Sequence, residues 1–172
     1  PAAGRYNCDC SGLISFLLKQ DLPRQYRAVP FPNAVKHPRA VEFYEAFVAA
    51  PVQPTAGKPW QHVERFAEAR PRDILACRKE PLPPKGNTGH IVLLDSLPKP
   101  IAENLFEVVV IDSTSYPHHN DTRPGKITGV GRGTIYVKTD SDGHPLGYAS
   151  KSPQGPFLLN PTAIARPITP AN

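Results

Sequence analysis

The spacing of apolar residues changes near Asp73, and this change limits the possible folds more than any other feature of the chain. Before Asp73, apolar side chains recur three and four positions apart, as they do on one face of an amphipathic helix. After it, they alternate with polar residues or form short runs rich in valine and isoleucine, which is typical of β-strands. Helices followed by strands predict an α+β fold, in which N-terminal helices pack on a mainly antiparallel β-sheet.

Three segments have helical spacing, namely residues 10–19, 37–50 and 60–69. In the second segment, Pro38 suits the first turn of a helix, where a backbone N–H has no intrahelical partner. In the third, apolar residues follow Trp60 at helical intervals. We therefore expect three helices in the first part of the chain.

Five later segments have the pattern of strands, and they span residues 74–78, 90–94, 106–113, 133–138 and 146–150. The dipeptide Asp142-Gly143 predicts a tight turn, so the last two segments should form a hairpin. A chain of 172 residues with 40% hydrophobic content can bury one sizeable core. We therefore expect a single domain over residues 1–172, and no apolar run is long enough to predict a transmembrane segment.

The sequence Asp9-Cys10-Ser11-Gly12 comes directly before an apolar helical run, which places a thiol at the start of a helix. Helix N-termini stabilise anions, so this cysteine should ionise readily and act as a nucleophile. A lone cysteine on a helix is often only a core residue, but the polar neighbours favour an accessible thiol. We interpret Cys8 and Cys77 as structural, because one precedes the helix and the other lies in an expected strand.

Two later strands offer a base and a residue to orient it. His90 begins one expected strand, and Asp112 lies near the end of another, after an apolar run. A carboxylate buried there needs a partner, and an imidazole N–H on an adjacent strand would supply one. The sequence thus predicts a catalytic group of Cys10, His90 and Asp112, which occur in this order along the chain. These residue types suit acyl transfer through a thioester. We also expect Tyr6, Asp9 and Ser11 to contact the substrate.

Other features of the chain argue against further ligands. The formal charge of +5 favours anionic partners, but the basic residues are scattered, so we expect no nucleic-acid partner. Adjacent histidines on a strand point in opposite directions, so we interpret residues 118–121 as a solvated loop and expect no metal and no cofactor. The glycine-rich segment 129–133 precedes a strand, not a helix, and predicts a turn or bulge, not a phosphate site.

Three short motifs resemble those of the NlpC-type papain-like cysteine peptidases of bacterial cell-wall hydrolysis. They are Asp9-Cys10-Ser11-Gly12-Leu13 at a helix start, Arg72-Asp73-Ile74-Leu75 before the sheet, and Gly89-His90-Ile91-Val92 at a strand start. The resemblance covers about residues 6–115 and implies a papain-like fold. Residues from about 116 onward would then form a family-specific C-terminal extension of the sheet. The chain departs from the family by lacking an aromatic-Gly-Gly element before the cysteine and by having Asp112 at a position that is commonly histidine.

The resemblance implies a cysteine hydrolase that cleaves an amide bond in peptidoglycan stem peptides. It also implies an exported, periplasmic or cell-wall associated protein. The chain contains no methionine, and we expect it to be a processed product. Two alternatives stay open: an amidase or acyltransferase of the same fold with a substrate outside the wall, and a catalytically inactive domain that binds the wall.

Overall fold

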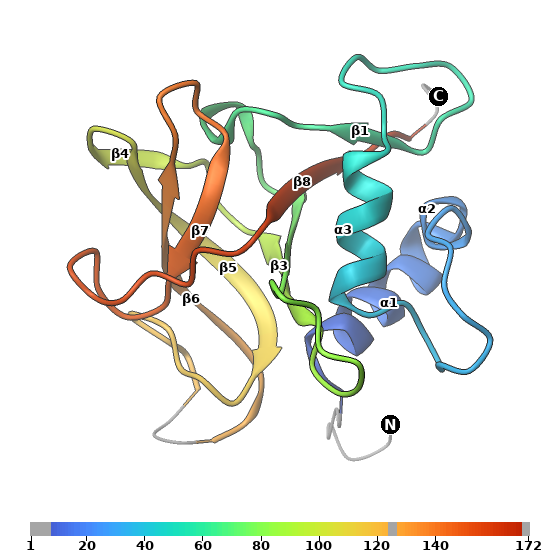
Figure 1. Ribbon diagram of the computed structural model, residues 1–172, viewed down its shortest axis with the longest axis horizontal. Coiled ribbons are helices and arrows are strands. Elements are labelled where there is room, and N and C mark those ends of the chain that lie inside the picture. The colour runs from blue at the N-terminus through green and yellow to red at the C-terminus, as the bar shows by residue number, and fades with distance from the viewer. Residues whose placement is uncertain (1–7, 124–126, 170–172) are drawn as a thin grey trace.

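The computed structural model describes residues 8–123 and 127–169. The fold is α+β, and one eight-stranded sheet, antiparallel at every pairing, is accompanied by three α-helices in these two ranges (Figure 1). The prediction of N-terminal helices followed by a mainly antiparallel sheet is thus confirmed. None of the helices in the described part is long and apolar enough to cross a membrane.

The helices come first in the chain and cover one face of the sheet. They are α1 (Cys10–Asp21), α2 (Pro23–Arg27) and α3 (Ala40–Val48). α1 begins where expected because the Asp9 carboxylate caps it, accepting a hydrogen bond from the Gly12 N–H at 2.7 Å. The buried faces of α1 and α3 pack against strand residues such as Ile74 and Ile91. This contact forms the first of two apolar cores.

The sheet is assembled from strands that are distant in the sequence. They are β1 (Trp60–His62), β2 (Ile74–Arg78), β3 (Gly89–Leu94), β4 (Lys99–Ala102), β5 (Leu105–Thr114), β6 (Gly129–Thr139), β7 (Pro145–Ala149) and β8 (Thr162–Pro167). Their order is β1-β8-β2-β3-β5-β6-β7, and β4 pairs with β5. Strands β6 and β7 therefore form one end of the sheet, whereas β8 lies between β1 and β2.

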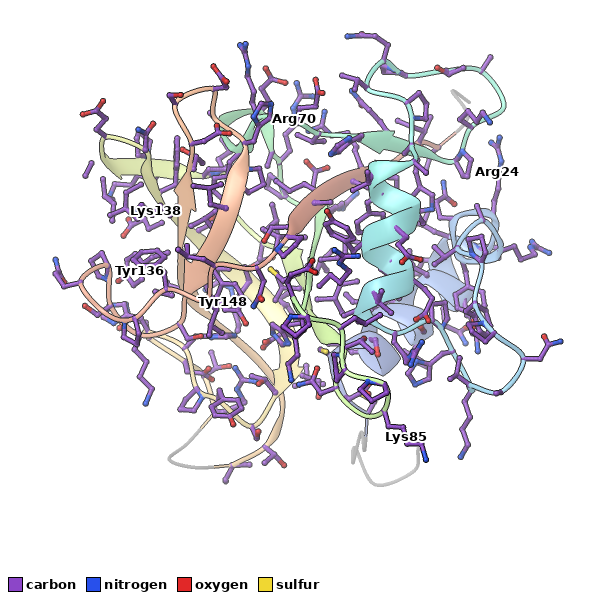
Figure 2. All side chains as sticks on the ribbon, in the orientation of Figure 1. Arg24, Arg70, Lys85, Tyr136, Lys138 and Tyr148 are labelled. Carbon is purple, nitrogen blue, oxygen red and sulfur yellow. The ribbon has the colours of Figure 1, made fainter. Side chains whose placement is uncertain are left out.

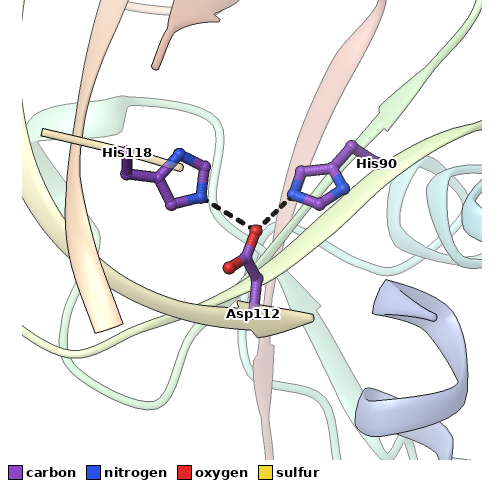
Figure 3. A group of neighbouring side chains, drawn as sticks. All are labelled: His90, Asp112 and His118. Carbon is purple, nitrogen blue, oxygen red and sulfur yellow. Dashed lines mark hydrogen bonds and ion pairs between the residues drawn. The ribbon is translucent and has the colours of Figure 1, made fainter. Parts of the chain in front are cut away.

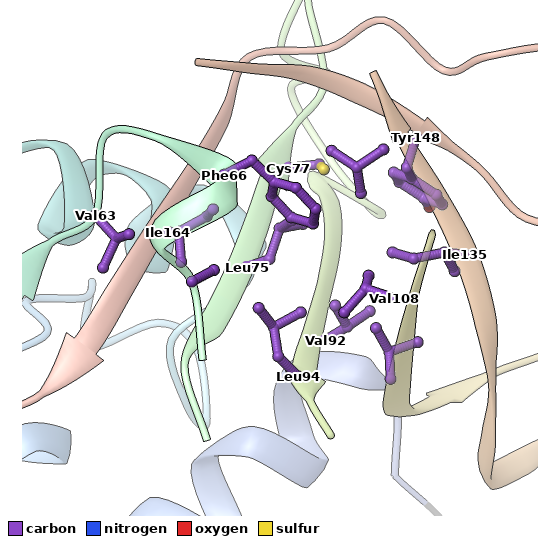
Figure 4. Packing of buried hydrophobic residues seen from close by; sticks show 13 residues of the cluster. Val63, Phe66, Leu75, Cys77, Val92, Leu94, Val108, Ile135, Tyr148 and Ile164 are labelled. Carbon is purple, nitrogen blue, oxygen red and sulfur yellow. The ribbon is translucent and has the colours of Figure 1, made fainter. Parts of the chain in front are cut away.

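The face of the sheet away from the helices curls around a second apolar core (Figure 4). Tyr148 of β7 forms a bridge with Leu158, which precedes β8, so the two ends of the curl approach each other. Side chains from six strands meet inside, and Phe66 of a short 3-10 helix (Phe66–Glu68) closes one side. We call the sheet surface that lines this core the inner face.

The strand predictions match the structure well, but the third predicted helix is wrong. Residues 60–69 form β1 and the short 3-10 helix instead of one continuous helix. The apolar spacing misled because two separate cores bury these side chains. Trp60 packs against Phe47 in the helix-covered core, whereas Phe66 enters the second apolar core. The predicted hairpin around Asp142-Gly143 is confirmed, since β6 and β7 pair on either side of it.

Candidate active site

The inner face is apolar along most of its length and becomes polar at one end. On β3, Leu94 and Val92 enter the second apolar core, and His90 is the next residue on the same face. On β5, Val108 and Val110 are followed in the same way by Asp112. The two polar side chains meet, with 2.7 Å between His90 Nε2 and Asp112 Oδ2. The predicted pairing of His90 with Asp112 is therefore present.

Cys10 completes the group from the first residue of α1. Its side chain lies close enough to His90 to raise the pKa of the imidazole. Because His90 Nε2 is bound to Asp112, the ring nitrogen left for the thiol is Nδ1. Cys10 and His90 both line a cavity of about 1110 Å³, which gives a ligand access to the sulfur.

Asp112 is fully buried and is surrounded by positive or hydrogen-bonding groups (Figure 3). His118 Nε2 lies 2.8 Å from the same Oδ2 that binds His90. Arg123 Nη1 lies 3.2 Å from Oδ1, an ion pair that lacks hydrogen-bond geometry. Burial raises the pKa of the Asp112 carboxyl, but the hydrogen bonds from His118 and His90 outweigh this and hold the pKa well below its usual range. Asp112 is therefore a carboxylate at neutral pH.

His90 has the opposite shift. Burial lowers the pKa of its imidazole, but the hydrogen bond with Asp112 and the neighbouring Cys10 side chain more than compensate and raise the pKa to about 9. The ring is therefore protonated at neutral pH, with its Nε2–H directed at Asp112. An imidazolium beside a cysteine is the arrangement that stabilises a thiolate in cysteine hydrolases.

His118 does not lie in a solvated loop, and that prediction is wrong. Its side chain is only 2% exposed and contacts Asp112. The loop is held in place because the Asp121 carboxylate accepts hydrogen bonds from the backbone N–H groups of His118 and Arg123, at 2.7 and 2.8 Å. His119, the next residue, is exposed. Only one of the two adjacent histidines thus belongs to the site.

The glycine-rich segment explains how His118 and Arg123 fit. It is not a turn or bulge as predicted but the start of β6, paired with β5. A Cβ atom added to Gly133 would lie 2.7 Å from the His118 Cβ, and one added to Gly131 would lie 2.5 Å from Arg123 Nε. Alternate glycines thus leave room for two side chains that arrive from the loop. Alternating glycines in a strand were the sequence signal for this packing.

The expected substrate-binding residues have different positions. Tyr6 lies outside the described residues. Asp9 and Ser11 both line the cavity, but the Ser11 hydroxyl donates to the Asp9 carboxylate, and that carboxylate also caps α1. The two side chains therefore organise the start of the helix beside the thiol.

The other two cysteines also line the cavity. Cys8 precedes α1, and Cys77 lies in β2, as expected. Cys77 is buried beside Thr162, and burial raises the pKa of its thiol to about 12, so it stays protonated. Burial also raises the pKa of the Cys8 thiol. Cys77 is the cross-strand partner of His90, but of the three thiols only that of Cys10 contributes to the raised pKa of His90.

His90, Asp112 and His118 also form a group that could hold a divalent metal ion, since one ligand atom of each lies within 4.8 Å of the others. The Arg123 guanidinium beside Asp112 opposes this, because it adds a positive charge where a cation would bind. A second such group, Asp140, Asp142 and His144, is largely exposed in the turn between β6 and β7. There Asp140 already accepts hydrogen bonds from two backbone N–H groups of the turn.

Comparison of the chain with protein-family models, with curated proteins and with solved structures gave no match.

Proposed function

We propose that the protein is a papain-like cysteine hydrolase that cleaves an amide bond through a thioester. The observation that carries this proposal is the placement of Cys10 and His90 at the wall of one large cavity, with His90 hydrogen-bonded to buried Asp112. A nucleophile, a base and a residue that orients the base are the three parts that this chemistry requires.

The reaction would proceed in two steps, formation of the thioester and its hydrolysis. The Cys10 sulfur attacks the carbonyl carbon, and His90 gives its proton to the amine nitrogen as the carbon–nitrogen bond breaks. His90 then takes a proton from water as the water oxygen attacks the carbonyl carbon of the thioester. The carbon–sulfur bond breaks, which releases the acid and the Cys10 thiolate. The backbone N–H of Cys10 would help to hold the oxyanion, because N–H groups in the first turn of a helix have no intrahelical acceptor.

His118 and Arg123 would act as positioning residues in this mechanism. Together they contact both oxygens of Asp112, which limits rotation of the carboxylate. A fixed carboxylate fixes the His90 ring in turn, so that Nδ1 faces the thiol. The site would thus depend on two layers of side chains around the sulfur.

The proposed substrate is the stem peptide of peptidoglycan, and the proposed location is exported, periplasmic or cell-wall associated. Support comes from the motifs around Cys10, Asp73 and His90, which resemble those of NlpC-type enzymes. The net charge of +5 also favours an anionic polymer. The reaction class rests on the site geometry, whereas the substrate rests on this resemblance.

Purified muropeptides incubated with the protein test the proposal, with new free amines followed by mass spectrometry. Cleavage should be lost in Cys10→Ala and retained in Cys8→Ala, which removes a second thiol from the same cavity. Rapid alkylation of Cys10 without muropeptide cleavage would favour an amidase or acyltransferase with another substrate. A Cys10 that alkylates no faster than an ordinary thiol would instead favour an inactive domain that binds the wall.

A further inference from the structure

The cavity in front of Cys10 has an uneven distribution of charge. Apart from histidines, the charged side chains that line it within the described ranges are Arg39, Lys79, Lys151 and one carboxylate, that of Asp9. Arg39 is paired with Glu42, and the Asp9 carboxylate caps α1. The two lysines therefore decide which charged ligands the cavity favours.

Lys79 and Lys151 are exposed, and neither forms an ion pair within the part of the chain that the structure describes. An unpaired ammonium group in a partly enclosed cavity attracts anions more strongly than one on an open surface. A second such group at the same cavity adds to this attraction.

The backbone holds both lysines near His90. Lys79 directly follows β2, and its N–H donates to the Thr88 carbonyl at 2.8 Å, two residues before His90 in the chain. Lys151 follows β7, whose Tyr148 ring lies 6.1 Å from the His90 ring, centroid to centroid. The Ser150 carbonyl beside Lys151 accepts a hydrogen bond from the His119 N–H at 2.8 Å. The backbones of Lys79 and Lys151 are thus held next to the ends of two different strands, β2 and β7.

We propose that Lys79 and Lys151 bind a carboxylate of the substrate, so that the protein acts on amides of acidic compounds. This inference rests on the proposed function, because it concerns the substrate of the Cys10 thiol. Lysine suits the task as a flexible point charge that can follow a carboxylate over several positions. Amides of similar size without a free carboxylate should be poorer substrates.

Iodoacetate and iodoacetamide test this inference without a known substrate. Each reagent forms a carbon–sulfur bond with the Cys10 thiolate and releases iodide, but only iodoacetate carries a carboxylate. The measurement is the iodoacetate rate divided by the iodoacetamide rate at Cys10, at low ionic strength and in a Cys8→Ser background. Mass spectrometry locates the modified residue. We expect the doubly substituted Lys79→Gln/Lys151→Gln protein to have a ratio about fivefold lower, with the iodoacetamide rate unchanged.

Lys138→Gln is the matched control, because this exposed lysine lies on β6 outside the cavity. In Figure 2, Lys138 lies nearer to the edge of the molecule than Tyr148, which lines the cavity. The control should leave the ratio unchanged, and about 0.5 M salt should reduce the difference between the proteins by screening.

The possible outcomes separate the two proposals. A Cys10 that reacts quickly with both reagents, but whose rate ratio is the same in both proteins, would overturn the carboxylate inference alone. An equal fall in both rates would also overturn it, because the lysines would then affect the thiol and not the anion. A Cys10 that reacts slowly with iodoacetamide in every protein would contradict the proposed function itself.

Discussion

The helix-covered face of the sheet and its inner face are both apolar over most of their area, but they differ at one end. On the covered face, Ile74 and Ile91 simply continue a core with Phe43 and Phe47 from α3. On the inner face, the apolar rows end in His90 and Asp112, which are held by charged and hydrogen-bonding partners. The same strands thus build an apolar core on one face and place buried titratable groups on the other.

The largest difference between the faces should appear when one residue of each is changed. Asp112→Asn keeps the shape but removes the charge that orients His90, so turnover should fall about 10²- to 10⁴-fold. Phe47→Ala on the covered face should lower the free energy of unfolding by about 3–5 kcal/mol, with turnover per folded molecule retained. Steady-state kinetics and urea unfolding of both variants measure this. A loss of turnover in folded Phe47→Ala would show that the two faces are not independent.

The inner face should also make stability depend on pH. The pKa of His90 rises from 6.5 to about 9 on folding, so its contribution is full below 6.5 and is lost as the pH rises through about 9. We expect about 2–3 kcal/mol less stability near pH 10 than near pH 6 from this group. Urea unfolding at both pH values measures the loss, and His90→Gln should show a smaller one. Equal losses in the two proteins would contradict the assignment.

The pKa of Asp112 is lowered on folding, so the sign of its effect is reversed. Its contribution is present above the unfolded pKa and is lost as the pH falls through the lower folded value. The native site should therefore be most stable between the titration ranges of the carboxylate and the imidazolium.

A smaller effect is expected for the residue that supports Asp112 from the loop. His118→Ala removes one of two hydrogen bonds to Oδ2, so kcat should fall about tenfold while KM stays nearly constant. His118→Gln, which can still donate, should restore part of the rate, and His119→Ala is the control because that neighbour is exposed. A change in KM alone would assign His118 to substrate binding.

The smallest effect should come from the strand behind His118. Gly133→Ala places a methyl group 2.7 Å from the His118 Cβ, so the loop must shift. We expect about 1–2 kcal/mol of lost stability and a fall in turnover of a few fold. Arg132→Ala, at the exposed neighbouring position, should change both by less. Equal effects of the two substitutions would indicate a general weakening of β6.

The periodicity of the sequence predicted the strands that carry His90 and Asp112, because apolar alternation depends only on which face is buried. The sequence also predicted the thiol at the start of α1, because Asp9, directly before Cys10, is a residue type that commonly caps helices. It failed for His118 and Arg123, because these side chains are buried by a loop that folds over Gly131 and Gly133 of β6. The apolar pattern of the loop itself gives no sign of this contact. It failed for β1 and β8 because their pairing is long-range, and short strands carry little local signal.

The position of β8 between β1 and β2 has a consequence for how the protein is made. Cys77 of β2 contacts Thr162 of β8 across 85 positions of the chain, and β8 pairs along most of β2. During synthesis, β2 and β3 therefore leave the ribosome long before their neighbour exists, with one edge of β2 open. The chain can complete its sheet only after β8 emerges, so the Cys10 thiol gains its finished surroundings at the end of translation of this region and not before.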